Sequence, residues 1–437
     1  MRGNRVWRVV LGLNKAVIED VDIAEPAGGY GDSVVVVRVH PTRSAKSRCG
    51  VCQRKCRGYD QGEGSRRWRS LDLGTIQVFV EAEAPRVRCR DHGVVVAAVP
   101  WAKHDAGHTL AFDATVAWLA TKCSKTAAMT LMRVAWRTVG AIVDRTWSEI
   151  EAMHDRFANV RRIGIDEISY KRHHKYLTVV VDHDTGNLLW AAEGKSKKVL
   201  TKFFEELGEE RCNQITHVSA DGAQWISQVV AKQCPDAVRC ADPFHVVAWA
   251  TDALDRVRRG AWNDARAAAK KEPKLPRGRP ATDAPPRPAT ERAKAIKGCR
   301  YALWKNPDNL NDQQQTKLAW VAKTDQRLYR AYLLKEGLRT VFRLPYVQAV
   351  IALDRWISWA RRCRIPAFVE LQQKITRHKA SILAAIEHGL SNGRIESMNT
   401  KIRLITRIGF GFKSPAALIA LAMLSLGGHQ PALPGRM

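Results

Sequence analysis

The chain of 437 residues is too long for one ordinary domain, and with 45% hydrophobic side chains it can build several cores. Its 71 Lys and Arg against 43 Asp and Glu give a formal charge of +28, which favours a polyanionic partner. A membrane surface would attract the same charge, but no apolar run approaches the roughly 20 residues that a span needs, and the first residues lack the apolar core of a signal peptide. We therefore expect a cytoplasmic protein that binds nucleic acid and no membrane.

Residues 1–105 are expected to form a small β-rich domain, with strands at 34–39 and 76–82. The ten cysteines of the chain should be thiols in the cytoplasm, and four of them cluster in this domain. Two pairs with two-residue gaps lie here: Cys49 with Cys52, and Cys89 with His92. The short gap lets both side chains of a pair reach the same tetrahedral ion, so the spacing predicts one structural zinc ion. Cys56 could replace a member of the set, and coincidental cysteines in a loop are the alternative.

Residues 106–155 predict a helix-turn-helix domain. The expected helices are 112–122, 124–132 with Ser124 as its N-cap, and a third that follows a tight turn and ends near residue 150. In such domains the last helix enters the major groove of DNA. The side chains expected to face the groove or the phosphates are Arg137, Thr138 and Arg145. A three-helix spacer without DNA contacts is the alternative.

Residues 156–250 alternate between strands and helices. The expected strands are 161–168, 176–182, 188–193, 215–220 and 238–241, with helices at 198–207 and 225–232. A turn at residues 184–187 makes the second and third strands a hairpin. Three antiparallel strands followed by alternating helix and strand are typical of the ribonuclease-H-like fold, in which the ends of the first and fourth strands are neighbours.

Three acidic residues in this pattern suggest a metal-dependent reaction. Asp166 and Asp221 close two of the expected strands, and Glu396 lies near the start of a basic helix. Ionised carboxylates that converge on one point repel each other unless cations lie between them. Hard oxygen ligands suit Mg²⁺ or Mn²⁺, and two such ions about 4 Å apart can activate a nucleophile and stabilise a leaving group on phosphate.

Three other carboxylates compete for this assignment. Asp182 and Asp184 belong to the hairpin turn, and Glu167 should point to the opposite strand face from Asp166. We therefore rank all three below the first set.

Residues 251–384 predict a basic, all-α insertion, with 15 Lys and Arg against 5 Asp and Glu between residues 255 and 305. Arg258 and Arg259 are expected to contact DNA phosphates. A Pro-rich linker at 272–288 contains Arg277 and Arg279, which resemble the core of an AT-hook, a minor-groove reader; a solvated linker is the other reading. The insertion also carries four tryptophans that could form an interface, stack on bases or fill its own core: Trp304, Trp320, Trp356 and Trp359.

Four motifs together resemble the DDE transposases of bacterial insertion sequences, most closely the type often called ISL-three. They begin at Gly164 (Gly-Ile-Asp-Glu), Ala220 (Ala-Asp-Gly-Ala), Asp242 (Asp-Pro-Phe-His) and Asn392 (Asn-Gly-Arg-Ile-Glu-Ser-Met-Asn). With the zinc pairs, the resemblance covers nearly the whole chain. Two departures are His92, where cysteine is usual, and a linker longer than expected.

The resemblance implies a multidomain α+β protein with a zinc-binding domain, a helix-turn-helix, and a ribonuclease-H-like core interrupted by the insertion and completed by residues 385–437. It implies that Asp166, Asp221 and Glu396 hold two Mg²⁺ (or Mn²⁺) ions, and that Asp242 and His245 form a supporting signature.

The implied function is that of a bacterial transposase, associated with the nucleoid when bound to DNA. It would bind the terminal inverted repeats of an insertion sequence and catalyse metal-dependent DNA cleavage and strand transfer into target DNA. Because two ends are cut and joined together, we expect a homodimer or larger assembly on DNA. A nuclease without strand transfer and a catalytically inactive, sequence-specific repressor are the alternatives.

Overall fold

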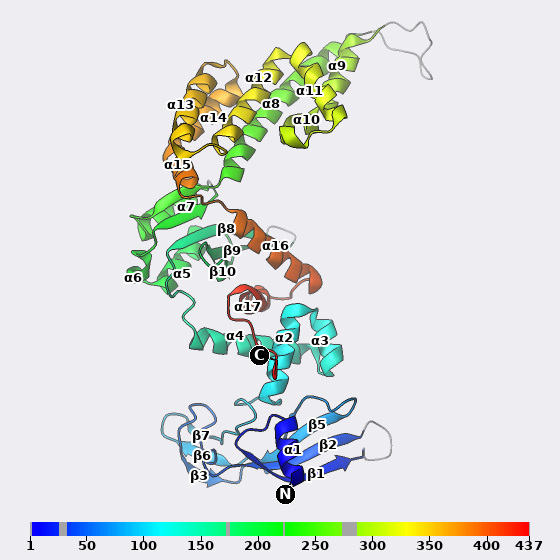
Figure 1. Cartoon of the computed structure of the whole chain (residues 1–437), viewed down its shortest axis with the longest axis vertical. Helices are drawn as coiled ribbons and strands as arrows, with labels where there is room; N and C mark the ends of the chain where they lie inside the picture. Colours follow the sequence, from blue (N-terminus) through cyan, green and yellow to red (C-terminus); the bar gives the residue numbers. More distant parts are fainter. Residues whose placement is uncertain (1, 26–32, 172–174, 222, 273–285, 437) are drawn as a thin grey trace. The chain divides into compact units, whose positions relative to one another are not determined.

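The computed structural model describes the chain except for residues 1, 26–32, 172–174, 222, 273–285 and 437 (Figure 1). It forms two compact units, Met1–Arg156 with Ile402–Met437, and Phe157–Lys401. The sequence had grouped residues 385–437 as the last helices of the catalytic core and the C-terminus, and in the structure Ile402–Met437 belongs to the first unit. In the described part of the chain, no helix is both long and apolar enough to cross a membrane.

The N-terminal unit begins with two small sheets. In one, strands β1 (Ala16–Ala24), β2 (Val34–Pro41), β5 (Gln77–Glu83) and β4 (Ser65–Arg69) lie in the order β1-β2-β5-β4, with α1 (Arg2–Val10) before them. Inward side chains of these strands, such as Val37, Trp68 and Val80, are buried in one core. The other sheet joins β3 (Arg57–Asp60), β6 (Arg86–Cys89) and β7 (Gly93–Val96). The two expected strands are present.

Three helices follow, α2 (Leu110–Lys122), α3 (Lys125–Met132) and α4 (Trp136–Met153). The Ser124 hydroxyl accepts a hydrogen bond from the backbone N–H of Ala127, so it caps α3 as expected. The core of the three helices also includes Leu421 and Leu424 of α17 (Pro415–Leu426). This C-terminal helix, apolar along most of its length, completes the helix-turn-helix core.

The second unit is built on a five-stranded sheet in the order β10-β9-β8-β11-β12. Its strands are β8 (Arg162–Lys171), β9 (Lys175–Asp182), β10 (Leu188–Glu193), β11 (His217–Ala220) and β12 (Val238–Ala241). The first three are antiparallel, and β11 runs parallel to both β8 and β12. Helices α5 (Lys197–Leu207) and α7 (Gln224–Gln233) pack on the sheet through Phe203, Phe204 and Ile226, and the short α6 (Glu209–Cys212) lies between them in sequence. This is the strand order expected for a ribonuclease-H-like core.

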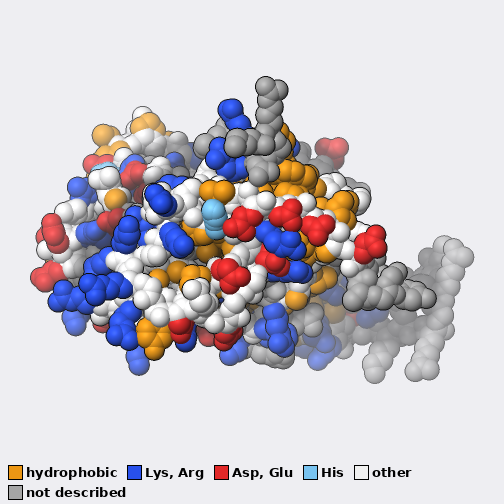
Figure 2. Space-filling model, turned by 90° about the horizontal axis from the view of Figure 1, so that it is seen from below, with side chains coloured by type: hydrophobic (Ala, Val, Ile, Leu, Met, Phe, Trp, Pro, Cys, Tyr) orange, Lys and Arg blue, Asp and Glu red, His pale blue; other side chains and the backbone are white. Residues whose placement is uncertain are grey.

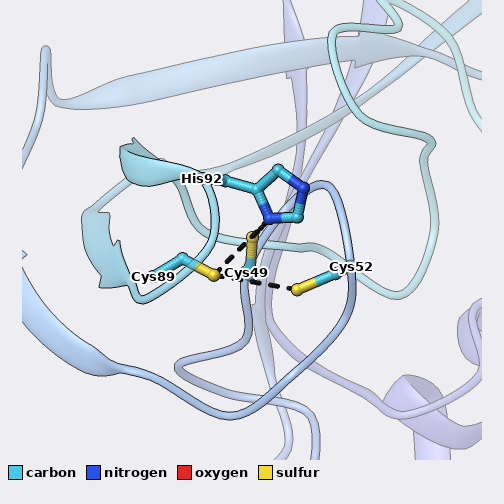
Figure 3. Close-up of side chains that lie close together, drawn as sticks. All are labelled: Cys49, Cys52, Cys89 and His92. Carbon is cyan, nitrogen blue, oxygen red and sulfur yellow. Dashed lines mark hydrogen bonds between the residues drawn. The ribbon is translucent and has the colours of Figure 1, made fainter.

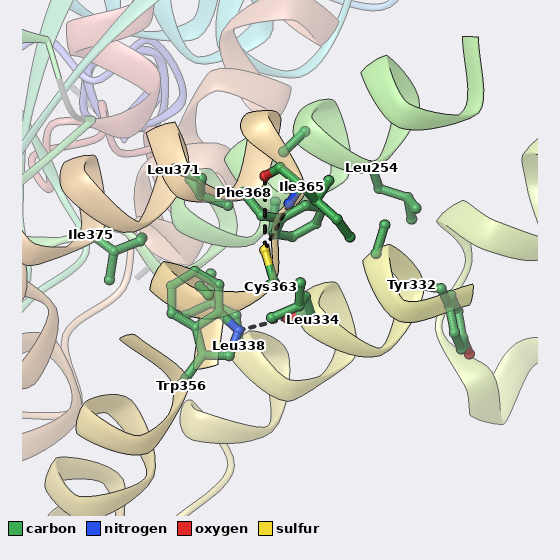
Figure 4. Packing of buried hydrophobic residues seen from close by; sticks show 14 of the residues in the cluster. Leu254, Tyr332, Leu334, Leu338, Trp356, Cys363, Ile365, Phe368, Leu371 and Ile375 are labelled. Atoms are coloured by element: carbon green, nitrogen blue, oxygen red, sulfur yellow. Dashed lines mark hydrogen bonds between the residues drawn. The ribbon is translucent and has the colours of Figure 1, made fainter. Parts of the chain in front are cut away.

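The insertion is a helical bundle whose long first helix, α8 (Pro243–Ala269), leads away from the sheet (Figure 1). Its other elements are α9 (Pro288–Gly298), α10 (Arg300–Trp304), η1 (Pro307–Asn309), α11 (Asp312–Thr324), α12 (Gln326–Val341), α13 (Tyr346–Arg362), α14 (Pro366–Arg377) and α15 (Lys379–Glu387). Buried side chains from several helices fill one core (Figure 4). Trp356 lies in it, and its indole N–H donates to the carbonyl of Leu334 at 2.7 Å.

Three of the four insertion tryptophans thus serve the bundle itself, because Trp304 and Trp320 also pack against this core. Only Trp359, 40% exposed, leaves a large part of its ring to solvent. The chain returns to the sheet through α16 (Gly393–Ile408), which carries Glu396 in its first turn.

Candidate active site and zinc centre

Two neighbouring parallel strands bring Asp166 and Asp221 together. In the ladder between β8 and β11, Ile165 pairs with Ala220, and the residue that follows each of them in the sequence is an aspartate. Burial raises the pKa of the Asp166 carboxyl, and the negative charge of Asp221 raises it further, while a hydrogen bond from the backbone N–H of Glu167 opposes the shift. The sheet therefore holds a partly desolvated acidic pair, which a cation would stabilise.

Helix α16 is fixed next to this pair by a side chain that the sequence had not singled out. Asn399 is buried, and its Nδ2 donates to Oδ2 of Asp166 at 2.8 Å. Glu396 precedes Asn399 by three positions, so the two side chains are neighbours on the helix surface. Glu396 itself is exposed. The helical spacing from Glu396 was the signal that could have revealed Asn399.

The start of α16 is anchored by a chain of buried polar groups. His183 Nε2 and Ser219 Oγ lie 2.7 Å apart, and Ser219 Oγ donates to Oδ1 of Asn392 at 2.7 Å. The backbone N–H of Asn392 in turn donates to Oδ1 of Asp242 at 3.1 Å. Buried polar groups that hydrogen-bond to one another in this way favour one geometry. They set the position from which α16 presents Glu396.

Asp242 and His245 form a pair at the start of α8. Asp242 caps this helix and accepts a hydrogen bond from His245 Nδ1 at 2.7 Å. That hydrogen bond raises the pKa of His245, with further contributions from the charges of Asp242, Asp221 and Asp166. His245 therefore carries more positive charge near neutral pH than an ordinary histidine, close to the acidic pair.

The competing carboxylates differ in their surroundings. Asp182 accepts hydrogen bonds from the backbone N–H groups of Asp184 and Thr185, and Asp184 pairs with Arg162, so both serve the hairpin. Glu167 is half-buried, and burial followed by the charge of Asp221 raises its pKa. Glu167 is thus a fourth carboxylate within electrostatic reach of Asp221.

The zinc ligands converge as the spacing predicts (Figure 3). Cys52 Sγ and Cys89 Sγ lie 3.7 Å apart, and His92 Nδ1 lies 3.5 Å from Cys89 Sγ and 3.8 Å from Cys49 Sγ. Ligands of one tetrahedral zinc ion stand about 3.8 Å apart, so the cluster fits this metal. The hydrogen bond with His92 lowers the pKa of the Cys89 thiol to about 6, which favours the thiolate that zinc binds. Cys56 lies outside the cluster.

Among the described residues, this is the only group of three or more Cys, His, Asp or Glu whose ligand atoms all lie within 4.8 Å of one another. The carboxylates of Asp166, Asp221 and Glu396 are therefore spread more widely. A site for two ions about 4 Å apart does not need a tighter cluster, because its outer ligands bind different ions. Their oxygen donors and the partly buried charge of the acidic pair suit hard divalent cations.

Five of the seven side chains expected to bind DNA belong to the described residues. Arg137 is exposed and Thr138 is half-buried at the start of α4. Arg145, however, donates to Oδ2 of Asp113 at 2.5 Å, and Asp113 is 1% exposed. Arg258 is also buried and donates to Asp255 at 2.8 Å.

The structure thus gives Arg145 and Arg258 internal partners, in contrast to the expectation from sequence. Arg259 extends to solvent while also contacting Asp255. Arg277 and Arg279 lie outside the described residues. On the face in Figure 2, Lys and Arg side chains are spread among acidic and apolar ones. The described residues on this face therefore show no continuous basic surface that would mark a DNA-binding site.

Three family models match segments between residues 45 and 422. A model described as a transposase, for the DDE domain of the ISL3 family, matches residues 163–422. The chain belongs to the ISL3 transposase family. A model for the helix-turn-helix domain of the same family matches residues 97–147, and one for the zinc finger of the IS204/IS1001/IS1096/IS1165 transposases matches residues 45–92.

Curated relatives agree with this assignment. The transposase for insertion sequence element IS1557 from two Mycobacterium tuberculosis strains, CDC 1551 / Oshkosh and H37Rv, is 64% identical over 437 residues, which cover 100% of this chain and 98% of the relative. The transposase for IS1001 of Bordetella parapertussis is 25% identical over 371 residues, covering 84% of this chain and 85% of that protein. As a member of the ISL3 family, the chain is a DDE-type enzyme that binds DNA, with a structural zinc and a requirement for divalent metal.

Gly164 lies on β8 two positions before Asp166, where α16 packs too closely to leave room for a larger side chain. A Cβ at this position would lie 2.3 Å from Cδ1 and 2.7 Å from Cγ1 of Ile395, a fully buried side chain beside Glu396. We expect Gly164→Ala to displace α16 and reduce DNA cleavage by about tenfold or more, because displacements near 1 Å are costly in catalysis. The measurement is the cleavage rate, with zinc content and DNA affinity as controls for the N-terminal unit. Unchanged cleavage by a folded variant would show that α16 does not depend on this contact.

Proposed function

We propose that the chain cuts DNA at the terminal inverted repeats of its element and joins the freed ends to target DNA, with Asp166, Asp221 and Glu396 holding two Mg²⁺ ions. The register that sets Asp166 beside Asp221 carries this proposal. The hydrogen bond from Asn399 to Asp166 supports the inclusion of Glu396, because it ties the same helix to the acidic pair. Bound ions would activate the attacking oxygen and stabilise the leaving oxygen of the phosphodiester.

The protein side chains then have separate roles. Asp166 and Asp221 provide oxygen ligands from a rigid sheet, and Glu396 provides a third from α16. Asn399 keeps the Asp166 carboxylate in one orientation, and the polar chain through Asn392 keeps α16 in place. His245, held by Asp242, would place a positive charge near the phosphate being cut.

For DNA recognition, we propose that the zinc domain and the three helices after it read the inverted repeats. Arg137 and Thr138, at the start of α4, would contact the DNA, and Arg259 would contact phosphates from the insertion. Arg145 and Arg258 are left out of this interface because their guanidinium groups bind Asp113 and Asp255. We also propose that two or more copies assemble on paired ends, since the charge of +28 opposes assembly without DNA.

One experiment separates the proposal from its alternatives. The purified protein is incubated with Mg²⁺, a fragment carrying the ends of the element that encodes it, and a target plasmid. We expect joined products. Nicked ends without joining would indicate a nuclease, and end binding without nicking would indicate a repressor. The repressor is disfavoured because a protein that only binds DNA gains nothing from the partly desolvated acidic pair.

A further inference from the structure

A pocket in the second unit opens beside Asp221 but uses none of the other residues assigned above. Its volume is about 420 Å³, and its walls come from β11, β12, α7, the end of α14 and α15. Val218, Val230 and Val238 are among its apolar lining, while Arg239, Arg377 and His378 add positive or protonatable groups. An acidic residue of the proposed site and two arginines thus share one cavity.

A fourth basic group extends this cluster. Lys374 lies over the ring of Trp249, with its Nζ 3.5 Å from the ring centroid, and the Trp249 and His378 rings are 5.4 Å apart. Burial lowers the pKa of His378, and the charges of Lys374, Arg377 and Arg239 lower it further, which places these cations within electrostatic range of one ring. Asp252 and Asp221 are the acidic groups that act on Lys374.

The cluster is held in place by the core of the insertion. Phe368, Leu371 and Ile375 occupy the buried side of α14, which fixes the rotation of this helix (Figure 4). Lys374 and Arg377 therefore project from positions that the core does not use. In the described part of the chain, no carboxylate forms an ion pair within 4.0 Å of Arg239, Lys374 or Arg377. Many other arginines of the chain, such as Arg256 and Arg343, do have such partners.

Like charges gathered around a cavity without paired carboxylates repel each other, and an anion between them would remove that cost. We propose that this pocket binds a backbone phosphate of the DNA strand that passes Asp221, and that Arg239 and Arg377 are its principal ligands. Arginine suits this role because its planar group can donate two hydrogen bonds to phosphate oxygens. The inference rests on the proposed function, and it assigns to the insertion a part in holding the strand next to the acidic pair.

The test is the salt dependence of DNA binding by the full chain with EDTA present, so that no cleavage is needed. The probe is a labelled duplex of the element end, and affinity is measured by fluorescence anisotropy over a range of KCl concentrations. Each lost phosphate contact lowers the slope of log affinity against log salt by about 0.9. Because both arginines are proposed to hold one phosphate, we expect the double variant Arg239→Gln/Arg377→Gln to lower the slope by about 0.9, and Arg239→Lys/Arg377→Lys to restore most of it.

The matched control is Lys198→Gln/Lys202→Gln, which removes two exposed charges from α5 in the same unit. We expect its slope to stay near that of the unmodified chain. An unchanged slope in Arg239→Gln/Arg377→Gln, or an equal fall in the lysine control, would contradict the proposed phosphate contact in this pocket. So would protection of Arg377 from arginine-specific reagents by inorganic phosphate but not by the duplex.

Failure of the pocket and failure of the proposed function give different results. A chain that joins DNA ends but shows no slope change in the arginine variant lacks the pocket contact only. A chain whose slope falls as expected but which never cuts DNA has the contact and lacks the proposed chemistry.

Discussion

Asp166→Ala should lower the rate of DNA cleavage by about 10³-fold or more, which corresponds to about 4 kcal/mol of lost transition-state stabilisation. The expected cause is the loss of an oxygen ligand at the centre of the acidic pair. End binding should remain, because the zinc domain and the helix-turn-helix belong to the other compact unit. The rate is measured by single-turnover cleavage of a labelled end fragment.

The control is Asp184→Asn, which changes an exposed aspartate that pairs with Arg162 in the hairpin turn of the same sheet. Its cleavage rate should stay within a few-fold of the unmodified chain. Near-normal cleavage by Asp166→Ala would remove this residue from the proposed site.

A second readout does not depend on activity. Mg²⁺ should raise the Tm of the unmodified chain and leave that of Asp166→Ala unchanged, since a ligand that binds the folded state stabilises it. The raised pKa of Asp166 fixes the sign of the pH effect. The proton competes with the metal, so the Mg²⁺-dependent shift in Tm should shrink as the pH falls toward that raised pKa and grow as the pH rises above it.

Removal of zinc should have the second large effect. Cys49→Ser deletes a fully buried ligand, and structural zinc binding is worth about 10 kcal/mol or more in small zinc domains. We expect the variant to lose its zinc, the ordered β3-β6-β7 sheet and most of its affinity for the element ends. Metal analysis, circular dichroism and anisotropy measure these three quantities.

Cys56→Ser is the matched control, because this nearby thiol lies outside the cluster. It should retain one zinc ion per chain and normal affinity. If Cys49→Ser kept its metal while Cys56→Ser lost it, the ligand set would have to be reassigned.

Much of the second unit could be predicted from the sequence because its strands are short apolar runs with clear turn signals. The segment 238–241 was placed without error, and the neighbouring ends of β8 and β11 followed from the order of the elements. The N-terminal unit was harder. Strand β1 reads Ala-Val-Ile-Glu-Asp-Val-Asp-Ile-Ala, and its two adjacent acidic residues coincide with a bulge, so its alternation is broken.

The residues around the site also fall into two groups: some could be found from the local sequence pattern, and others only from how the helices pack. Asp166 and Asp221 could be found because each follows an apolar run, whereas Asn399 has no such mark and depends on how α16 packs. Arg258 was assigned to DNA because it lies in a basic stretch, but its burial depends on the packing of the insertion helices. Charge composition predicts the partner of the chain and does not tell which arginines reach it.

Because α16 and α17 come late in the sequence, the proposed metal site and the helix-turn-helix core can form only late in synthesis of the chain. Glu396 is synthesised 175 residues after Asp221, and the helix-turn-helix core receives Leu421 and Leu424 only after that. Until residue 396 has emerged, a nascent chain lacks a complete set of proposed metal ligands, and until residue 424 has emerged it lacks a complete helix-turn-helix core. A translation product interrupted before residue 396 is therefore not expected to cut DNA, and one interrupted between residues 396 and 421 is expected to bind the element ends poorly.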